Sequence, residues 1–589
     1  MHGPRRLLFL QLPRLDPDVT MPGENAMLAA AGLQTALERS REAPRWRVAP
    51  TPAAQDAAGN AALLEAIARA APNVVAATLY LWNVERTLRL LAALKRRLPG
   101  LRTVVGGPEV CRDHPLLEHA AGADVAVIGE GEPVFPSLLA ALRRGRETDW
   151  QTVGWRRGRG RAWGRRPPPC RPLAELLPAV DHPVCRPDRH GMASLETSRG
   201  CPLRCAFCCY NLRRRAWSGL APAEVGRRIR ALRRRGAREI RLVDPTFNAH
   251  PRFRAVLGAM RRANPGRRIR FFVEIRADTL TDADAAALAA AGVAEAEVGV
   301  QSTDPGVLRR LRRPADLGRV RRGLEALERH GIRPTIDFLY GLPGQGPEDV
   351  AAALRWLAAF PKAHAQILPL LLLPGTELRD RRRALGLRAQ RLPPYRVVAT
   401  RLLGRRRMAA LERRAERQLG GFDAPTRRFV GTRLPDLFQA PGGRRQAPGD
   451  GCQVSGVESP DSALRTPHSA LRTLAAAAAA NRRTVFFAGD DLYAQRRAIV
   501  AAMRAAVAAE PDILWQFVLA PSREEPLDLL DAMIAAVRRL PPHWLDRLVS
   551  PADRRRFASR RVFVRLPAGR RFDPEWRAEA EQLLSYAFH

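Results

Sequence analysis

The sequence predicts an α/β protein built from two successive series of strands and helices. Short apolar, partly β-branched runs alternate with amphipathic helical patterns over residues 1–145 and again over residues 190–377. Glycine-rich turns follow several of the runs directly. The first series predicts an open, doubly wound, Rossmann-like parallel sheet, and the second predicts a partial barrel.

The composition is that of a folded protein, and it weakens the interpretation that the positive charge serves to bind nucleic acid. Of the 589 residues, 46% are hydrophobic and 27% are charged, which excludes wholesale disorder. The formal net charge of +39 would suit nucleic acid. However, Lys95 and Lys362 are the only lysines, and the chain is also crowded with alanine, glycine and proline. Because these residues and arginine share GC-rich codons, we attribute much of the charge to coding bias and expect no nucleic-acid partner.

The N-terminal sequence and the hydropathy pattern favour a cytoplasmic protein. The apolar stretch 7–12 is too short for a signal peptide, and no small-residue cleavage site follows it. No apolar run approaches the roughly 18–20 residues of a membrane-spanning helix. We therefore expect a first buried strand here, a cytoplasmic location and no membrane partner.

The first series, residues 1–145, is expected to contain five strands. These are residues 7–12, a short strand ending at Val48, and residues 74–81, 103–105 and 124–128, with helices at 26–38, 61–70, 85–97 and 135–143. The runs 106–109 (Gly-Gly-Pro-Glu) and 129–132 (Gly-Glu-Gly-Glu) follow the last two strands. Sheets of this type bind ligands at those strand ends.

The second series, residues 190–377, follows a proline- and arginine-rich stretch, 146–189, that we interpret as a linker. Thr281 and Asp284 resemble a capping box before a helix that should stop at Gly292. The expected strands are 194–197, 239–243, 269–275, 296–300, 335–340 and 366–371. Six βα repeats predict a partial (β/α)6 barrel with function on the loops after the strands.

The remainder of the chain carries weaker signals. Residues 378–440 are arginine-rich and predict a mostly helical extension. Residues 441–472 form a Gly/Pro/Ser-rich linker that we expect to be disordered. Residues 473–589 alternate short strands with helices, which predicts an α/β or helical domain of unknown role.

Four of the eight cysteines lie within nine residues, in the pattern C-x3-C-x2-C followed by one more cysteine. Three thiolates on one loop, from Cys201, Cys205 and Cys208, can bind three irons of a [4Fe–4S] cubane and leave the fourth iron open. A zinc site completed by Cys209 or by a distant histidine is the alternative.

The surrounding sequence resembles the radical SAM superfamily, whose signature is C-x3-C-x-aromatic-C after the first strand of a partial (β/α)6 barrel. The matching residues are Cys201, Cys205, Phe207 and Cys208. Further runs after successive strands are similar to family positions that contact S-adenosylmethionine (SAM). They place the expected contacts at Phe207, Asp244, Asn248, Glu274, Arg276, Gln301, Ser302 and Gly341.

This resemblance implies a reaction and its cofactors. A reduced [4Fe–4S] cluster would cleave SAM to methionine and a 5′-deoxyadenosyl radical, which abstracts hydrogen from an unactivated C–H bond. It implies an organic substrate that the sequence does not identify and an electron donor such as flavodoxin or ferredoxin. No catalytic side chain beyond the cluster ligands is expected.

Residues 1–145 resemble the cobalamin (B12)-binding domain that precedes the barrel in cobalamin-dependent radical SAM enzymes. The resemblance implies cobalamin contacts at Gly106, Gly107, Glu130 and Gly131. The D-x-H-x-x-G motif of other cobalamin domains is absent, so we expect no histidine ligand to cobalt.

The leading hypothesis is therefore a cobalamin-dependent radical SAM enzyme, with transfer of a methyl group to an unactivated carbon as one common task of this class. A tRNA methylthiotransferase-like enzyme is an alternative, but it would need three more cysteines in the first domain, where only Cys111 occurs. A non-enzymatic cobalamin or redox sensor is the third hypothesis.

Overall fold

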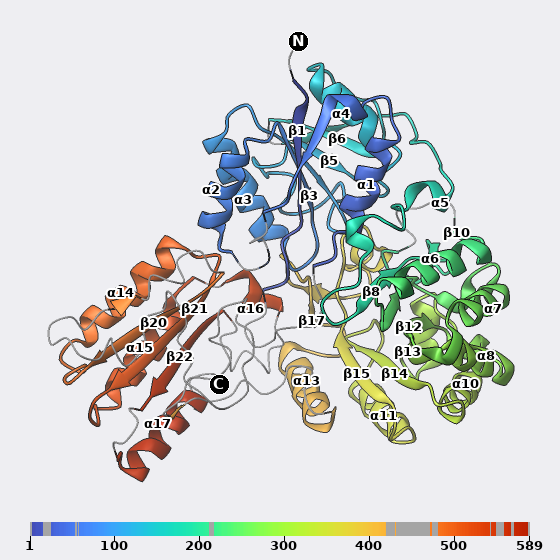
Figure 1. Ribbon diagram of the computed structural model, residues 1–589. Coiled ribbons are helices and arrows are strands. Elements are labelled where there is room, and N and C mark those ends of the chain that lie inside the picture. Colours follow the sequence, from blue (N-terminus) through green and yellow to red (C-terminus); the bar gives the residue numbers. More distant parts are fainter. Residues whose placement is uncertain are drawn as a thin grey trace. The chain divides into compact units, whose positions relative to one another are not determined.

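The computed structural model describes two compact units (Figure 1). The described residues are 3–15, 25–52, 56, 58–158, 160–210, 217–419, 430–431, 472–473, 481–541, 543–548, 559–566 and 571–586. The first unit takes the described residues of 1–12, 22–51 and 71–420, and the second takes those of 13–21, 52–70 and 421–589.

The first sheet of the first unit is parallel over five strands and ends in an antiparallel hairpin. Its order is β2-β1-β3-β4-β5-β6-β7. The strands are β1 (Arg5–Leu10), β2 (Trp46–Ala49), β3 (Val74–Thr78), β4 (Arg102–Gly106), β5 (Val125–Val127), β6 (Val153–Arg157) and β7 (Gly160–Trp163), with helices α1 (Leu28–Glu38), α3 (Val84–Arg97) and α4 (Phe135–Arg143). The strand order reverses between β1 and β3, which is the point where open α/β sheets bind ligands. The predicted doubly wound sheet is confirmed.

The hairpin β6–β7 lies in residues 146–189, for which we expected only a linker. Strand β6 pairs with β5 and extends the sheet. Val153 and Trp155 on β6 are buried in the core of the first sheet, whereas Arg156 and Arg157 are exposed. The sequence pattern missed the hairpin because only two inward positions in an arginine-rich run carry the strand signal. The short helix α5 (Leu173–Leu176) follows before the second sheet.

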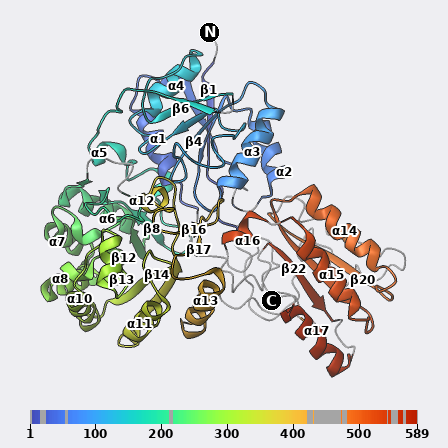
Figure 2. The same cartoon turned by 180° about the vertical axis from the view of Figure 1, so that it is seen from behind.

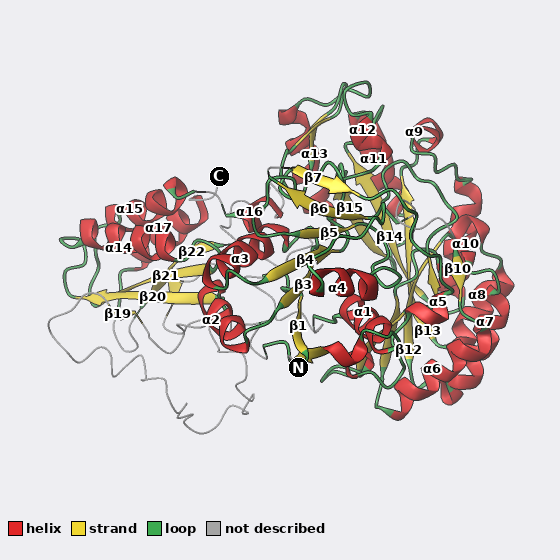
Figure 3. Ribbon diagram, turned by 90° about the horizontal axis from the view of Figure 1, so that it is seen from above, coloured by secondary structure: helices red, strands yellow, loops and turns green. Residues whose placement is uncertain are grey.

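The second sheet is parallel throughout, in the order β15-β14-β13-β12-β11-β8. Its strands are β8 (Met192–Leu195), β11 (Glu239–Leu242), β12 (Arg270–Ile275), β13 (Val293–Gln301), β14 (Arg333–Tyr340) and β15 (His364–Pro369). The helices are α6 (Pro222–Arg234), α7 (Phe253–Ala263), α8 (Asp282–Ala291), α9 (Pro305–Arg310), α10 (Leu317–Arg329) and α11 (Pro347–Leu357). Figure 3 shows α6, α7, α8 and α10 along the outer side of these strands. All six expected strands are present, which confirms the predicted partial barrel.

Local sequence signals explain where the barrel helices start and stop. The Asp284 amide donates to Thr281 Oγ1 at 3.1 Å, and the Thr281 amide donates to Asp284 Oδ2 at 3.3 Å, so the predicted capping box forms at α8. Helix α8 ends at Gly292, which has a φ of 99° that favours glycine. Asp304 caps α9 in the same way, by accepting the Val307 amide. The loops between strands and helices are therefore fixed by their own sequence.

The extension after the barrel belongs to the first unit. It contains α12 (Glu377–Asp380), the small hairpin β16 (Arg388–Ala389) and β17 (Val397–Ala399), and helix α13 (Arg405–Leu419). Met408 and Leu411 on α13 are buried against the barrel core. The extension thus completes the packing of the barrel.

The second unit is built around three parallel strands, β20 (Arg482–Gly489), β21 (Leu514–Pro521) and β22 (Arg560–Arg565). The short strands β18 (Val430–Gly431) and β19 (Arg472–Thr473) flank them. Its helices are α2 (Asn60–Ala70), α14 (Arg496–Ala509), α15 (Asp528–Arg539), α16 (Trp544–Leu548) and α17 (Pro574–Tyr586) (Figure 2). The tail is therefore an α/β unit, one of the two alternatives that the sequence left open. The expected linker 441–471 lies outside the described residues.

Candidate active site

The cysteine-bearing loop begins where the first barrel strand ends. After β8, the two-residue strand β9 (Ser198–Arg199) pairs with β10 (Ser218–Gly219), and Gly200 then turns the chain with a φ of 86°. Cys205 is 7% exposed, and Cys201 and Cys208 are half-buried. The Ala206 amide donates to the Leu311 carbonyl at 2.9 Å, and the Leu378 amide donates to the Ala206 carbonyl at 3.0 Å. The loop is thus anchored to α9 and to α12.

Asp244, at the end of β11, organises the start of this loop. Its Oδ1 accepts the Thr197 amide at 2.7 Å, and its Oδ2 accepts the hydroxyls of Thr197 at 2.5 Å and Ser198 at 2.6 Å. Burial raises the pKa of Asp244 to about 6, although these hydrogen bonds oppose the rise. Asp244 was expected to contact SAM, but its side chain has no exposed surface. In this structure it positions the loop.

The thiols lie in surroundings that favour a positively charged metal cluster. Burial and the neighbouring Cys209, Cys205 and Cys201 raise the pKa of Cys208 to about 12. Several thiolates so close together therefore need added positive charge, which iron supplies. Among the described residues, no three His, Cys, Asp or Glu side chains form a group that could hold a single metal ion. Three thiolates on one loop can each bind a different iron of a cubane, so the residue types and spacing of Cys201, Cys205 and Cys208 suit a [4Fe–4S] cluster.

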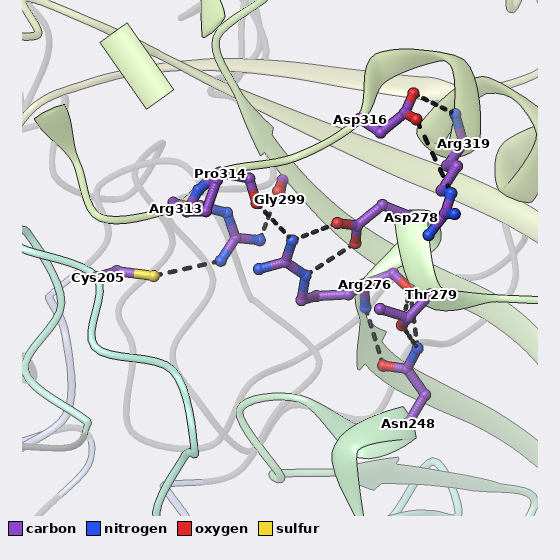
Figure 4. A network of polar contacts seen from close by, with 10 residues as sticks. All are labelled: Cys205, Asn248, Arg276, Asp278, Thr279, Gly299, Arg313, Pro314, Asp316 and Arg319. Atoms are coloured by element: carbon purple, nitrogen blue, oxygen red, sulfur yellow. Dashed lines mark hydrogen bonds and ion pairs between the residues drawn. The ribbon is translucent and has the colours of Figure 1, made fainter. Parts of the chain in front are cut away.

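Two arginines flank the cysteine loop, and only one was expected (Figure 4). Arg313, on the loop after α9, donates from Nη1 to Cys205 Sγ at 3.5 Å and from Nη2 to the Gly299 carbonyl at 2.6 Å. Arg276 follows β12 and binds Asp278, with Nε 2.8 Å from Oδ1. The hydrogen bond to Asp278 raises the pKa of Arg276, and the charges of Cys205 and Cys201 add to the rise. Arg313 went unrecognised in the sequence because it lies in an arginine-rich run.

Asn248, an expected SAM contact, is used to shape the same region (Figure 4). Its Nδ2 donates to the Arg276 carbonyl at 2.8 Å and to Thr279 Oγ1 at 3.0 Å, and its Oδ1 accepts the Arg276 amide at 2.9 Å. Both ends of the amide are therefore occupied by the loop after β12.

The inner face of the barrel is acidic and contains unsatisfied polar atoms. Burial, together with Glu297 and Asp244, raises the pKa of Glu274 on β12 to about 7. Burial and Glu297 raise the pKa of Asp337 on β14 to about 9. Gln301 Oε1 and Asp337 Oδ1 are buried and have no hydrogen-bond partner among the described residues. These two oxygen atoms can accept hydrogen bonds from a polar ligand, and SAM, which carries a net positive charge and several hydroxyl and amino donors, could supply them.

Three other expected SAM contacts, Ser302, Gly341 and Phe207, make the following contacts in the structure. Ser302 is 1% exposed and accepts the Asp304 amide at 3.1 Å. Gly341, with a φ of 81°, faces Met408 of α13, and an added Cβ would lie 3.3 Å from its Cε. Phe207 packs against the barrel core.

A cavity of about 370 Å³ opens at the carboxyl ends of the first sheet. Its lining includes Gly106, Gly107, Glu130 and Gly131, the residues expected to contact cobalamin. Gly107 has a φ of 105°, and a Cβ there would lie 2.7 Å from the Leu79 carbonyl oxygen. A Cβ at Gly131 would lie 2.9 Å from Leu33 Cδ2. At Gly107, where the added Cβ would meet backbone, only glycine lets the turn approach so closely, and the mostly apolar hollow suits the body of a large ring.

The opposite wall of this cavity is formed by the radical SAM-like barrel. Glu196, Arg199 and Gly200, at the start of the cysteine loop, line it together with Tyr210 just after the loop. The cavity thus joins the expected cobalamin site to the expected cluster site.

His114, the histidine nearest to the first glycine turn, is unavailable to a metal. It is 1% exposed, and its Nδ1 accepts the amides of Leu116 and Leu117 at 3.2 Å. Its Nε2 lies 3.0 Å from Glu109 Oε2 and 2.9 Å from the hydroxyl of Tyr395. No histidine lines the cavity among the described residues.

Two family models match the chain. Residues 28–139 match the B12 binding domain, and residues 195–357 match the radical SAM superfamily. No helix in the described part of the chain has the length and apolar character needed to cross a membrane.

The chain is similar to several methyltransferases. It is 25% identical to an uncharacterized methyltransferase of Pyrococcus horikoshii, over 47% of this chain and 61% of that protein. It is 35% identical to the cobalamin-dependent radical SAM methyltransferase TokK of Streptomyces tokunonensis, over 23% of this chain and 22% of that protein. The chain therefore spans less than two thirds of the length of these relatives.

A solved structure shares the fold. The radical SAM methyltransferase TsrM of Kitasatospora setae, with cobalamin and a [4Fe–4S] cluster bound, superposes with a TM-score of 0.53 at 19% identity. The match covers 66% of this chain and 81% of that one. This match and the two family models agree. The chain carries a B12-binding domain followed by a radical SAM domain, as the sequence predicted. The radical SAM domain implies a [4Fe–4S] cluster and SAM, and the B12-binding domain implies cobalamin.

Proposed function

We propose that this protein, with its B12-binding and radical SAM domains, is a cobalamin-dependent radical SAM methyltransferase acting on an unactivated carbon of an organic substrate. One observation carries the proposal. The cavity lined by the glycine turns of the first sheet is also lined by residues at the start of the cysteine loop. A corrin in this cavity and SAM at the cluster would therefore lie next to each other. The methyltransferases TokK and TsrM among the similar proteins support the choice of reaction.

The cofactors would supply the reactive chemistry, namely one-electron cleavage of SAM by the cluster and a methyl group carried on cobalamin. The chain's own residues hold and shield them. Cys201, Cys205 and Cys208 would ligate the cluster, and burial of Cys205 limits the access of water. Gln301 and Asp337 supply the unsatisfied oxygen atoms that would orient SAM in the barrel.

The partners and the location are part of the same proposal. A reductant is required for the cluster, and a small electron-transfer protein such as flavodoxin or ferredoxin is the class we expect. We expect an organic substrate that is not a nucleic acid, and we place the reaction in the cytoplasm.

The proposal is tested with protein purified and reconstituted without air. The absorption spectrum should show corrinoid bands superimposed on iron–sulfur absorbance. With a strong reductant and SAM, the protein should release 5′-deoxyadenosine or S-adenosylhomocysteine, and the Cys205→Ala variant should release neither. Corrinoid binding without any SAM turnover would support a cobalamin sensor and contradict the enzyme.

A further inference from the structure

The turn after β5 binds the residue that introduces the cysteine loop. Arg199 Nη1 lies 2.9 Å from Glu132 Oε1 and 3.2 Å from Glu130 Oε1. The two glutamates belong to the Gly-Glu-Gly-Glu run of the B12-binding domain. Arg199 belongs to the radical SAM domain and lies two residues before Cys201. One guanidinium therefore joins the two domains at their shared cavity.

The other edge of the same guanidinium is fixed as well. Arg199 Nε donates to Glu196 Oε1 at 2.7 Å, and Nη2 donates to Glu196 Oε2 at 2.8 Å. The arginine is thus a permanent cation held by three carboxylates in one geometry.

The backbone on both sides leaves little freedom at this contact. Glu132 is 9% exposed and packs over α1, where a Cβ at Gly32 would lie 3.2 Å from Glu132 Oε1. On the other side, Ser198 is held by Asp244, and Gly200 adopts a left-handed conformation before Cys201. A displacement of the glycine turn therefore pulls directly on the loop that carries the first cysteine.

We propose that Arg199 is a positioning residue that couples occupancy of the cavity by cobalamin to the conformation of the cluster loop. This inference rests on the proposed function. Glu130, expected from the sequence to contact cobalamin, then acts through Arg199. The turn that receives the corrin and the loop that receives the cluster respond as one body, because Glu130, Glu132 and Arg199 all line the same cavity.

The test compares the cluster-loaded full chain with and without saturating hydroxocobalamin. The rate at which a chelator removes cluster iron and the electron paramagnetic resonance (EPR) spectrum of the reduced cluster are measured. In the wild type, cobalamin should slow iron loss about fivefold, the low end of usual couplings between sites, and should change the EPR spectrum. In Arg199→Met the slowing should fall below about twofold, and the EPR spectrum should no longer respond to cobalamin.

A matched control removes an arginine of similar exposure that does not bridge the domains. Arg143 binds Glu42 at 3.1 Å, with its side chain 21% exposed against 22% for Arg199. Arg143→Met should retain the wild-type response. A double variant, Glu130→Gln with Glu132→Gln, removes the two carboxylates that Arg199 binds. It replaces Arg199→Met in the test if that variant does not fold.

The outcomes separate this inference from the proposed function. If cobalamin binds the wild type but leaves iron loss and the EPR spectrum unchanged, the coupling is wrong and the function stands. The coupling is also wrong if both the Arg199 variant and the double variant respond like the wild type. If the wild type binds no cobalamin at all, the proposed function fails and the inference fails with it.

Discussion

Arg313 donates an N–H to Sγ of Cys205 at 3.5 Å, while its second terminal nitrogen donates to the Gly299 carbonyl at 2.6 Å (Figure 4). A cation is thus fixed between a cluster ligand and strand β13. Hydrogen bonds to the sulfurs are one of the factors that set the reduction potential of an iron–sulfur cluster.

Replacing Arg313 should make the cluster harder to reduce. Reduction adds negative charge, which the guanidinium stabilises, so Arg313→Met should lower the midpoint potential. A differential stabilisation of about 1.4 kcal/mol corresponds to about 59 mV for one electron, and we expect a fall of this order. EPR at poised potentials measures it. The midpoint potential of Arg313→Lys should fall less, because lysine keeps the positive charge.

Arg319 provides the control for this experiment. It binds Asp316 and its side chain is 68% exposed, away from any cysteine contact in the structure. Arg319→Met should keep the wild-type potential. An unchanged potential in Arg313→Met would show that the contact with Cys205 does not act on the cluster.

The cysteine loop should lose its cluster when any one of three residues is removed. Cys201→Ala, Cys205→Ala and Cys208→Ala should each retain almost no iron or labile sulfide, because each removes one iron–thiolate bond. Cys209→Ala is the matched control, with iron content near that of the wild type. Iron and sulfide are counted in protein isolated without air, and full iron in the Cys205 variant would contradict the ligand assignment.

Gly107 should tolerate no side chain. Its φ of 105° and the 2.7 Å approach of an added Cβ to the Leu79 carbonyl combine strain with a clash against backbone. Gly107→Ala should destabilise the first sheet by about 2–4 kcal/mol and weaken cobalamin binding. Gly145, with a φ of 67° and nothing within 4 Å of an added Cβ, is the control for strain alone. Gly145→Ala should cost about 1–2 kcal/mol. Thermal unfolding measures the stability of both variants, and corrinoid titration measures their cobalamin binding. Equal losses in the two variants would show that the clash at Gly107 has no effect of its own.

The sequence predicted the two parallel sheets because their strands are short buried runs that alternate with helices. Where the signal lay within a few residues, as in the capping box of Thr281 and Asp284, the local detail was also predicted. The hairpin β6–β7 was missed because only two inward side chains, Val153 and Trp155, distinguish it from an arginine-rich linker.

The cluster ligands were visible in the sequence because all three lie on one loop. The arginines that hold or flank that loop were not. Arg199 meets Glu130 and Glu132, which lie more than 60 residues earlier in the sequence. Since arginine is so abundant in this chain, neither Arg199 nor Arg313 could be distinguished from solvated arginines without the fold.

Glu274 should make the stability of the chain depend on pH in a defined direction. Burial, then Glu297 and Asp244, raise its pKa from the usual 4.5 to about 7. A carboxyl with a raised pKa stabilises the folded state while protonated. This contribution is fully present below pH 4.5 and is lost as the pH rises through 7. Glu274→Gln keeps the neutral shape and does not titrate.

The unfolding temperature of Glu274→Gln should therefore match that of the wild type near pH 5 and exceed it increasingly up to about pH 8, after which the gap should level off. Thermal unfolding of both proteins across this range, without air, measures the gap. Glu239 makes a suitable control site, since its carboxylate lies at the other end of the barrel strands, and Glu239→Gln should show no such trend. A gap for Glu274→Gln that is constant with pH, or that closes as the pH rises, would mean that Glu274 is already ionised in the folded protein at pH 5.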